Sequence, residues 1–236
     1  MPMENQKSDL LNRMENWQIQ LEDEWSLEEI QRVLKVFDTL AEQTGTSSIP
    51  QLFNHQITIL KHSGRPGRVG RTKGNEIILD DNWTDWTFAH ELGHRWNNAW
   101  ERLPEQRLRQ AVGAGKFEWL KRALRRFEKW LERVFKKFDV KKKIDWPTLW
   151  YQPGSAPPPC GVDRNFNASE DLAESFAATI FPAEAKTRTN NVATRAIAFA
   201  KSWDWSTTFS DYLQTPRGQI TLQTIKELGS NNEYRV

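Results

Sequence analysis

Hydrophobic positions near the start of the chain repeat with a helical period. In residues 1–45 this spacing predicts two helices. The second helix begins at Ser26, which forms an S-x-x-E capping box with Glu29, and it ends near Gly45. The apolar residues that carry the pattern are Leu10, Met14, Trp17 and Leu21 in the first helix, and Ile30, Val33, Leu34, Phe37 and Leu40 in the second.

Strand-like and helix-like segments alternate further along the chain. Residues 56–61 and 76–80 predict strands, and the glycine-rich stretch 63–75 between them predicts a loop or a wide hairpin. A helix is predicted from about residue 83 to about residue 102. We therefore expect an α+β fold, mostly helical with a small mixed sheet, in a single domain over residues 1–236. Additional helices are predicted at about 169–181, 184–201 and 219–228.

The longest amphipathic pattern covers residues 113–138. Apolar residues recur there every three or four positions, which predicts a long helix within an insertion at 104–146. From Lys116 to Lys143 the chain has 12 basic and 4 acidic residues, although its total charge is only +2. Three interpretations remain open. The helix packs on the core with a solvated basic face, recruits acidic peptides, or contacts nucleic acid or an anionic membrane surface.

Composition excludes several classes of protein. The chain has 236 residues, of which 38% are hydrophobic and 27% charged, so it can build a core and is not disordered throughout. Cys160 is the only cysteine, which excludes an internal disulfide and a cysteine-based zinc finger. We interpret Cys160 as a passive loop thiol rather than an inhibitory metal ligand.

Targeting signals are not evident in the sequence. No apolar run approaches the roughly 18–20 residues of a membrane span. The first residues lack the basic and apolar regions of a secretory signal. The cytoplasm is therefore the default expectation for location, with export as an effector as the alternative, and the oligomeric state is not readable.

The segment His90-Glu91-Leu92-Gly93-His94 has the pattern H-E-x-x-H. On a helix, residues four positions apart lie on one face, so both imidazoles can reach one metal ion. Glu91, beside them, is then placed to take a proton from a metal-activated water. The competing interpretation is a pair of surface histidines on an amphipathic helix. The preceding predicted strand and the apolar face of this helix favour a zinc site.

A catalytic zinc site needs a third protein ligand. His55 and His62 are the other histidines, but both flank an upstream strand, which disfavours them. The extended motif H-E-x-x-H-x-x-G-x-x-H is absent, because Asn97 and Glu101 occupy the positions of its glycine and third histidine. The third ligand is therefore expected elsewhere in the chain.

Two glutamates in the predicted helix 169–181 are the better candidates. Glu170 and Glu174 are four residues apart and share one helical face. One of them can bind the metal while the other accepts a ring N–H from a ligating histidine. Acidic residues also suit the first turn of a helix, which is an alternative reason for their presence.

These two segments resemble the zincin metallopeptidases of the gluzincin type. The stretch from Trp86 to His94 is similar to the zinc helix of the ImmA/IrrE-type peptidases. The stretch from Glu170 to Pro182 resembles their second motif and that of the anthrax lethal-factor catalytic domain. The resemblance implies a zincin-like fold in which Glu170 is the third ligand and Glu174 an outer carboxylate. It also implies that residues 76–80 are the edge strand that pairs with an extended substrate.

The expected function is zinc-dependent hydrolysis of peptide bonds, with Zn²⁺ on His90, His94 and Glu170 and with Glu91 as the general base. Tyr151 is a candidate oxyanion donor, and Arg164 in the same loop is another. We expect a protein or peptide substrate, acidic in one interpretation, and this hypothesis disfavours a nucleic-acid partner.

Two other functional classes compete with the peptidase. The first is a catalytically silent zincin-fold module that binds an acidic partner, nucleic acid or a membrane surface through its basic helix. The intact Glu91 favours the enzyme, because a binding module needs no base beside the metal. The second is a structural zinc site on a nucleic-acid-binding protein. It requires a fourth ligand, which we do not find in the sequence.

Overall fold

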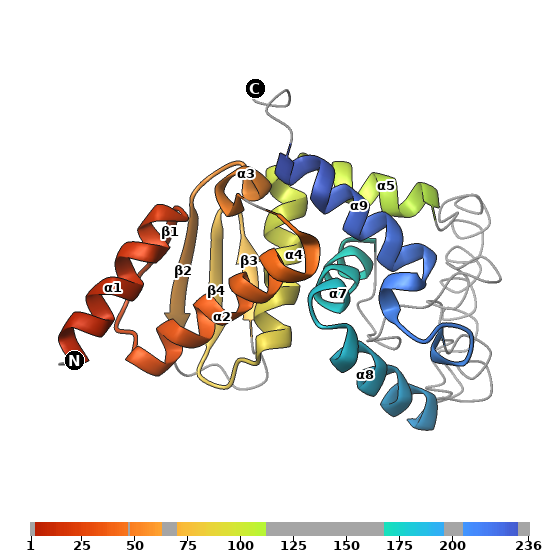
Figure 1. Cartoon of the computed structure of the whole chain (residues 1–236), viewed down its shortest axis with the longest axis horizontal. Coiled ribbons are helices and arrows are strands. Elements are labelled where there is room, and N and C mark those ends of the chain that lie inside the picture. Colours follow the sequence, from red (N-terminus) through yellow and green to blue (C-terminus); the bar gives the residue numbers. More distant parts are fainter. Residues whose placement is uncertain (1–2, 47, 63–69, 112–167, 196–204, 231–236) are drawn as a thin grey trace, which may run out of the picture.

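The computed structural model describes residues 3–46, 48–62, 70–111, 168–195 and 205–230. Within these ranges the chain has the predicted α+β fold, mostly helical with a small mixed sheet (Figure 1). The predicted helix 113–138 and most of the insertion 104–146 lie outside the described residues. Tyr151, Cys160 and Arg164 also lie outside them.

Four strands form the sheet, in the order β1 (Ile19–Leu21), β2 (Ile57–His62), β4 (Glu76–Asp80) and β3 (Gly70–Lys73). The pairs β1–β2 and β2–β4 are parallel, and β3 runs antiparallel to β4. Alternate side chains of the two central strands point to one face, which is buried against the helices. These buried residues are Ile57, Ile59, Ile77 and Leu79.

The strand expected at the edge lies inside the sheet, so that prediction was wrong. β4 lies between β2 and β3, because residues 70–73 of the predicted loop form an additional strand. Gly74, at φ +61°, makes the tight turn that folds β3 back onto β4. Within the described part of the chain, β3 is therefore the outer strand beside α4 (Asp85–Ala99).

The first predicted helix is shorter than its apolar spacing suggested. α1 (Met3–Asn16) ends before Gln18, whose left-handed backbone (φ +55°) breaks the helical path. Leu21 consequently belongs to β1 rather than to the helix. The second prediction is confirmed: α2 (Leu27–Thr44) has the complete capping box of Ser26 and Glu29 and ends at Gly45.

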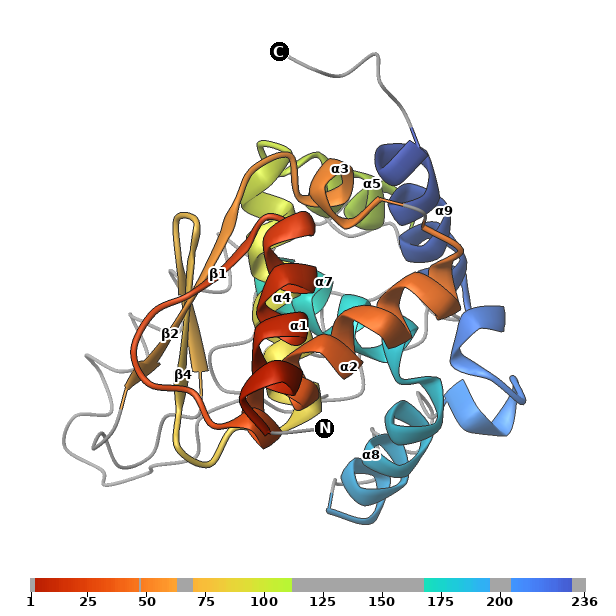
Figure 2. The ribbon, with the colours of Figure 1, turned by 60° about the vertical axis from the view of Figure 1, so that its left-hand side comes forward.

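The helices cover one face of the sheet. Figure 2 shows α1, α2 and α4 on the same side of the strands. The helix predicted from about 83 to 102 occurs as α4, which ends at Ala99, and the positive φ angles of Glu101 and Arg102 separate it from α5. The remaining helices are α3 (Ile49–Phe53), α5 (Leu103–Ala111), α7 (Ala168–Ile180), α8 (Pro182–Arg195) and α9 (Pro216–Ser230), with short 3-10 turns at Trp205–Thr207 and Tyr212–Gln214.

Aromatic side chains join these helices into one core. Phe37 of α2 contacts Phe88 of α4 with ring centroids 5.6 Å apart. Phe176 of α7 contacts Trp96 of α4, with centroids 5.1 Å apart, and Phe53 of α3. α4 and α7 are thus held side by side.

None of the helices in the described ranges combines the length and apolar character needed to cross a membrane.

Candidate metal centre

α4 presents the H-E-x-x-H segment from a firmly packed helix. The side chain of Thr84 accepts a hydrogen bond from the Thr87 N–H and caps the helix. Ala89, Leu92 and Trp96 are completely buried and anchor α4 in the core. The ligand candidates lie on a different face of the same helix, so their positions are set by a rigid element.

Gly93, between the two histidines, allows α7 to approach α4 closely. A Cβ atom at Gly93 would lie 2.8 Å from the Cα of Ala173 and 3.0 Å from the Cβ of Phe176. Any larger residue would push the two helices apart. This close crossing brings Glu170, 76 residues beyond His94, to the histidines. The sequence offers a signal for this role, a glycine within a helix, but not the identity of the helix that approaches it.

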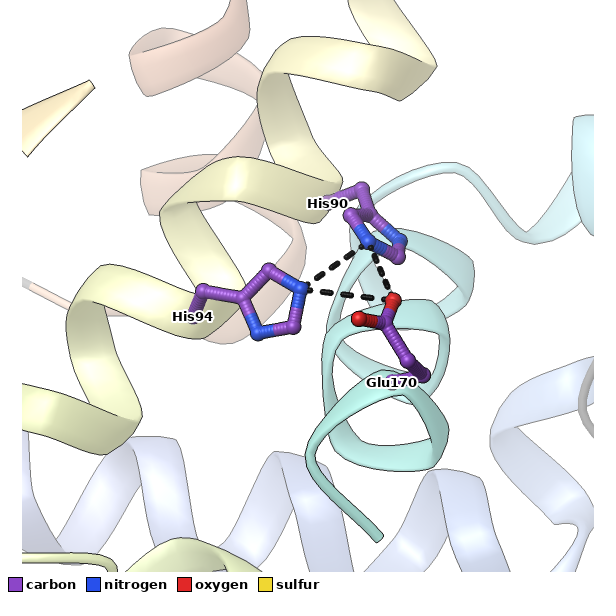
Figure 3. Close-up of side chains that lie close together, drawn as sticks. All are labelled: His90, His94 and Glu170. Carbon is purple, nitrogen blue, oxygen red and sulfur yellow. Dashed lines mark hydrogen bonds and ion pairs between the residues drawn. The ribbon is translucent and has the colours of Figure 1, made fainter. Parts of the chain in front are cut away.

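The side chains of His90, His94 and Glu170 converge on one point (Figure 3). His90 Nε2 lies 3.1 Å from His94 Nε2 and 3.1 Å from Glu170 Oε2. His94 Nε2 lies 3.4 Å from the same Glu170 oxygen. Zinc ligands lie about 2.0–2.1 Å from the ion, so two of them in a tetrahedral arrangement are about 3.3–3.4 Å apart. The three atoms are therefore compatible with a tetrahedral zinc ion.

The second nitrogen of each histidine ring faces an oxygen of α7. His90 Nδ1 lies 2.9 Å from Glu174 Oε1, and His94 Nδ1 lies 3.1 Å from Ser169 Oγ. Such contacts fix the ring orientation and leave Nε2 for a metal. Glu174 thus lies where the sequence interpretation puts an outer carboxylate. Ser169 is an addition that the sequence did not predict, since a serine at a helix start is ordinarily interpreted as a cap.

Carboxylates on both sides of His90 change its proton affinity. Burial by itself lowers the pKa of His90, but Glu170 and Glu174 stabilise the imidazolium and raise that pKa to about 10. The contacts of Glu170 with His90 and His94 hold the pKa of this glutamate well below its ordinary value. The metal-free protein therefore carries a protonated His90 and an ionised Glu170 at neutral pH.

Zinc binding at pH 7 is expected to release about one proton per chain, because a ligating imidazole must be neutral. The elevated pKa of His90 keeps this proton bound until the pH approaches about 10, so the apparent zinc affinity should rise with pH over that interval. Calorimetric titration in buffers of different ionisation enthalpy measures the number of protons. Zinc binding at pH 7 without proton release would contradict the described surroundings of His90.

Glu91 points from α4 towards β3 and is only 6% exposed. The hydroxyl oxygen of Thr72 lies 2.7 Å from Glu91 Oε2 and 2.9 Å from the main-chain carbonyl oxygen of Glu91. A Cβ atom at Gly70 would lie 3.0 Å from Glu91 Cγ, so this glycine leaves space for the side chain. The carboxylate is consequently held between the helix and the outer strand.

A buried ion pair joins α7 to α9. Asp171 is 5% exposed and accepts a hydrogen bond from Arg217 of α9, which is completely buried. Burial raises the pKa of Asp171, and the charge of Arg217 opposes this effect. Because Asp171 directly follows Glu170, the ion pair fixes the helix that carries the third candidate ligand.

The candidate site brings together His90, His94, Glu170 and Glu174 from the sequence interpretation, with Glu91 beside them on α4. In the described ranges, His55 and His62 are not part of this group. Comparison of the chain with protein-family models, with curated proteins and with solved structures found no match. The chemistry of the site is therefore what indicates a function for this chain.

Proposed function

We propose that the chain is a zinc-dependent metallopeptidase. The observation that supports this most directly is the convergence of two imidazole nitrogens and one carboxylate oxygen from His90, His94 and Glu170. Three protein ligands leave one coordination position for water or substrate, as in catalytic rather than structural zinc sites. Glu91 on the same helix adds a base that a purely structural site does not need.

Zinc in this position would supply Lewis acidity for activating water and polarising the scissile carbonyl. The chain contributes the proton transfers. Glu91 takes a proton from the attacking water and passes it to the leaving amine. Glu174 and Ser169 hold the imidazole rings of His90 and His94 in orientation during this cycle.

The sheet suggests how a peptide substrate binds. β3 is the outer strand in the described part of the sheet, and its Thr72 contacts Glu91. An extended peptide that adds to β3 through main-chain hydrogen bonds would pass beside the base. The proposed substrate is therefore a protein or peptide segment in extended conformation, and β3 takes the role that the sequence interpretation gave to residues 76–80.

Metal content tests this proposal directly. The wild type is expected to bind about one zinc ion per chain and to cleave members of a peptide library in a zinc-dependent manner. Glu170→Ala should lower zinc affinity by more than the roughly 10–100-fold that the loss of an outer partner costs. Elemental mass spectrometry after dialysis against a graded zinc buffer measures the zinc content and the zinc affinity. Cleavage of the library is measured separately, with and without zinc. Glu42→Ala removes an exposed glutamate of α2 and is the matched control.

The outcomes separate the possible functions. Zinc binding without hydrolysis of any library peptide would favour the silent binding module over the enzyme. A wild type that binds no zinc after refilling at neutral pH would contradict both the metal centre and the peptidase. Equal zinc affinities of Glu170→Ala and Glu42→Ala would remove Glu170 from the ligand set.

A further inference from the structure

The outer strand β3 meets the proposed base at two residues. Thr72 places its hydroxyl oxygen 2.7 Å from Glu91 Oε2, and Gly70 leaves the space that the Glu91 side chain fills. The two residues are two positions apart in a strand, so they are directed to the same face of the sheet. Both contacts therefore come from the strand face that is turned towards α4.

The hydrogen bond from Thr72 makes the two carboxylate oxygens of Glu91 unequal. Thr72 has one hydroxyl proton, which it shares between Glu91 Oε2 and the main-chain carbonyl oxygen of Glu91. Among the described residues, no hydrogen bond to Oε1 of Glu91 is found. An ionised oxygen without a protein donor is the stronger proton acceptor. Oε2 is thus bound by β3, whereas Oε1 has no donor in the described part of the chain and lies 3.3 Å from the position that a Cβ atom of Gly70 would occupy.

We propose that Thr72 is a positioning residue, which holds the Glu91 carboxylate through Oε2 from the outer strand and so orients the base. This inference rests on the proposed peptidase function. It adds that the base is held from two elements, α4 through the main chain of Glu91 and β3 through the hydroxyl of Thr72. A peptide that pairs with β3 consequently binds to the strand that also orients the base, so substrate binding and base alignment are coupled.

Packing around the contact between Thr72 and Glu91 explains why glycines lie near it at positions 70 and 74. The contact spans 19 residues of sequence, so the turn at Gly74 must hold β3 in register for Thr72 to reach Glu91. Gly70 pairs with Leu79, and Thr72 pairs with Ile77, in the β3–β4 ladder. A methyl group at Gly70 would lie 3.0 Å from both Glu91 Cγ and Thr87 Cγ2. Alanine at this position would therefore displace the carboxylate.

A hydroxyl-deleting substitution tests the proposal in the zinc-loaded enzyme. Thr72→Val keeps the branched shape and strand propensity but loses the donor. It is expected to lower kcat about tenfold or more, with KM changed less than about twofold and zinc content unchanged. Thr72→Ser restores the hydroxyl and should recover most of kcat. Thr58→Val, in the neighbouring strand β2, is the matched control and should resemble the wild type.

A second measurement does not depend on catalysis. In a double-mutant cycle of Thr72→Val and Glu91→Ala in the metal-free protein, urea unfolding should show a coupling of about tenfold or more in the unfolding equilibrium constant. Additive effects in this cycle, or a Thr72→Val enzyme with the kcat of the wild type, overturn the proposal. If the cycle shows coupling but the wild type hydrolyses no peptide, the contact between Thr72 and Glu91 is confirmed and the proposed peptidase function is overturned.

Discussion

Glu91→Gln is expected to lower kcat for peptide hydrolysis by about 10²–10⁴-fold, the usual contribution of a positioned general base. Glutamine matches the size of glutamate and can still accept the hydrogen bond from Thr72, so the fold and the helix should be unaffected. It cannot take a proton from water at neutral pH. The loss should consequently appear in kcat, with little change in KM.

The metal readout makes this experiment specific. Glu91 contributes none of the three atoms that converge at the candidate metal site, so Glu91→Gln should retain about one zinc ion per chain. Glu42→Gln, the same change at an exposed position of α2, provides the control for preparation and zinc loading. A Glu91→Gln protein with full zinc content and wild-type turnover would falsify the proposed proton transfer.

The largest stability effect is expected from Arg217→Met, which should lower the free energy of unfolding by about 3–5 kcal/mol. The substitution removes the partner of Asp171, a carboxylate that is only 5% exposed. An unpaired carboxylate in this position must either remain charged without solvation or take up a proton. Urea unfolding of the metal-free protein at pH 7 measures the difference.

The pH dependence identifies Asp171 as the cause. Burial raises the pKa of Asp171, and removing Arg217 eliminates the opposing charge. The pKa of Asp171 is already raised in the wild type, and in the folded variant it lies still further above the unfolded value, so protonation stabilises the variant more at low pH. This contribution is lost as the pH rises through the folded pKa. The deficit of Arg217→Met relative to the wild type should therefore be smaller at pH 4 than at pH 8.

Two further variants complete the experiment. Asp171→Leu in combination with Arg217→Met removes both charges and should recover most of the lost stability. Arg13→Met breaks an ion pair with Asp38 whose side chains are both more than 40% exposed, and should cost no more than about 1 kcal/mol. Equal costs for Arg13→Met and Arg217→Met would show that burial of the second pair is unimportant.

The sequence predicted those features that depend on neighbouring residues. The capping box of Ser26 and Glu29 and the placement of His90 and His94 on one face of a helix are local, and they occur as expected. Glu170 and Glu174 occupy one face of α7 for the same reason. Periodicity identifies a helix and its faces, but it does not say which element packs there.

Features that depend on long-range pairing were missed or misplaced. β1 has three residues, too few for a recognisable alternation, and it exists because it pairs with β2 far along the chain. The interior position of β4 follows from β3, whose glycine and charged residues suggested a loop. The contact of Thr72 with Glu91 likewise joins residues 19 positions apart, and that of Arg217 with Asp171 joins residues 46 positions apart.

The short strand β1 has a consequence for self-association. A parallel strand with an open side offers a row of unpaired main-chain groups to any other extended chain. β1 pairs with β2 from Ile57 to Ile59 and so closes that side of a strand with two fully buried isoleucines. Its own length of three residues leaves little edge to be copied, and Gln18 turns the chain away at its start. The N-terminal segment thus covers residues 57–59 at this edge of the sheet and leaves less of β2 open to intermolecular strand pairing, in addition to its part in the core.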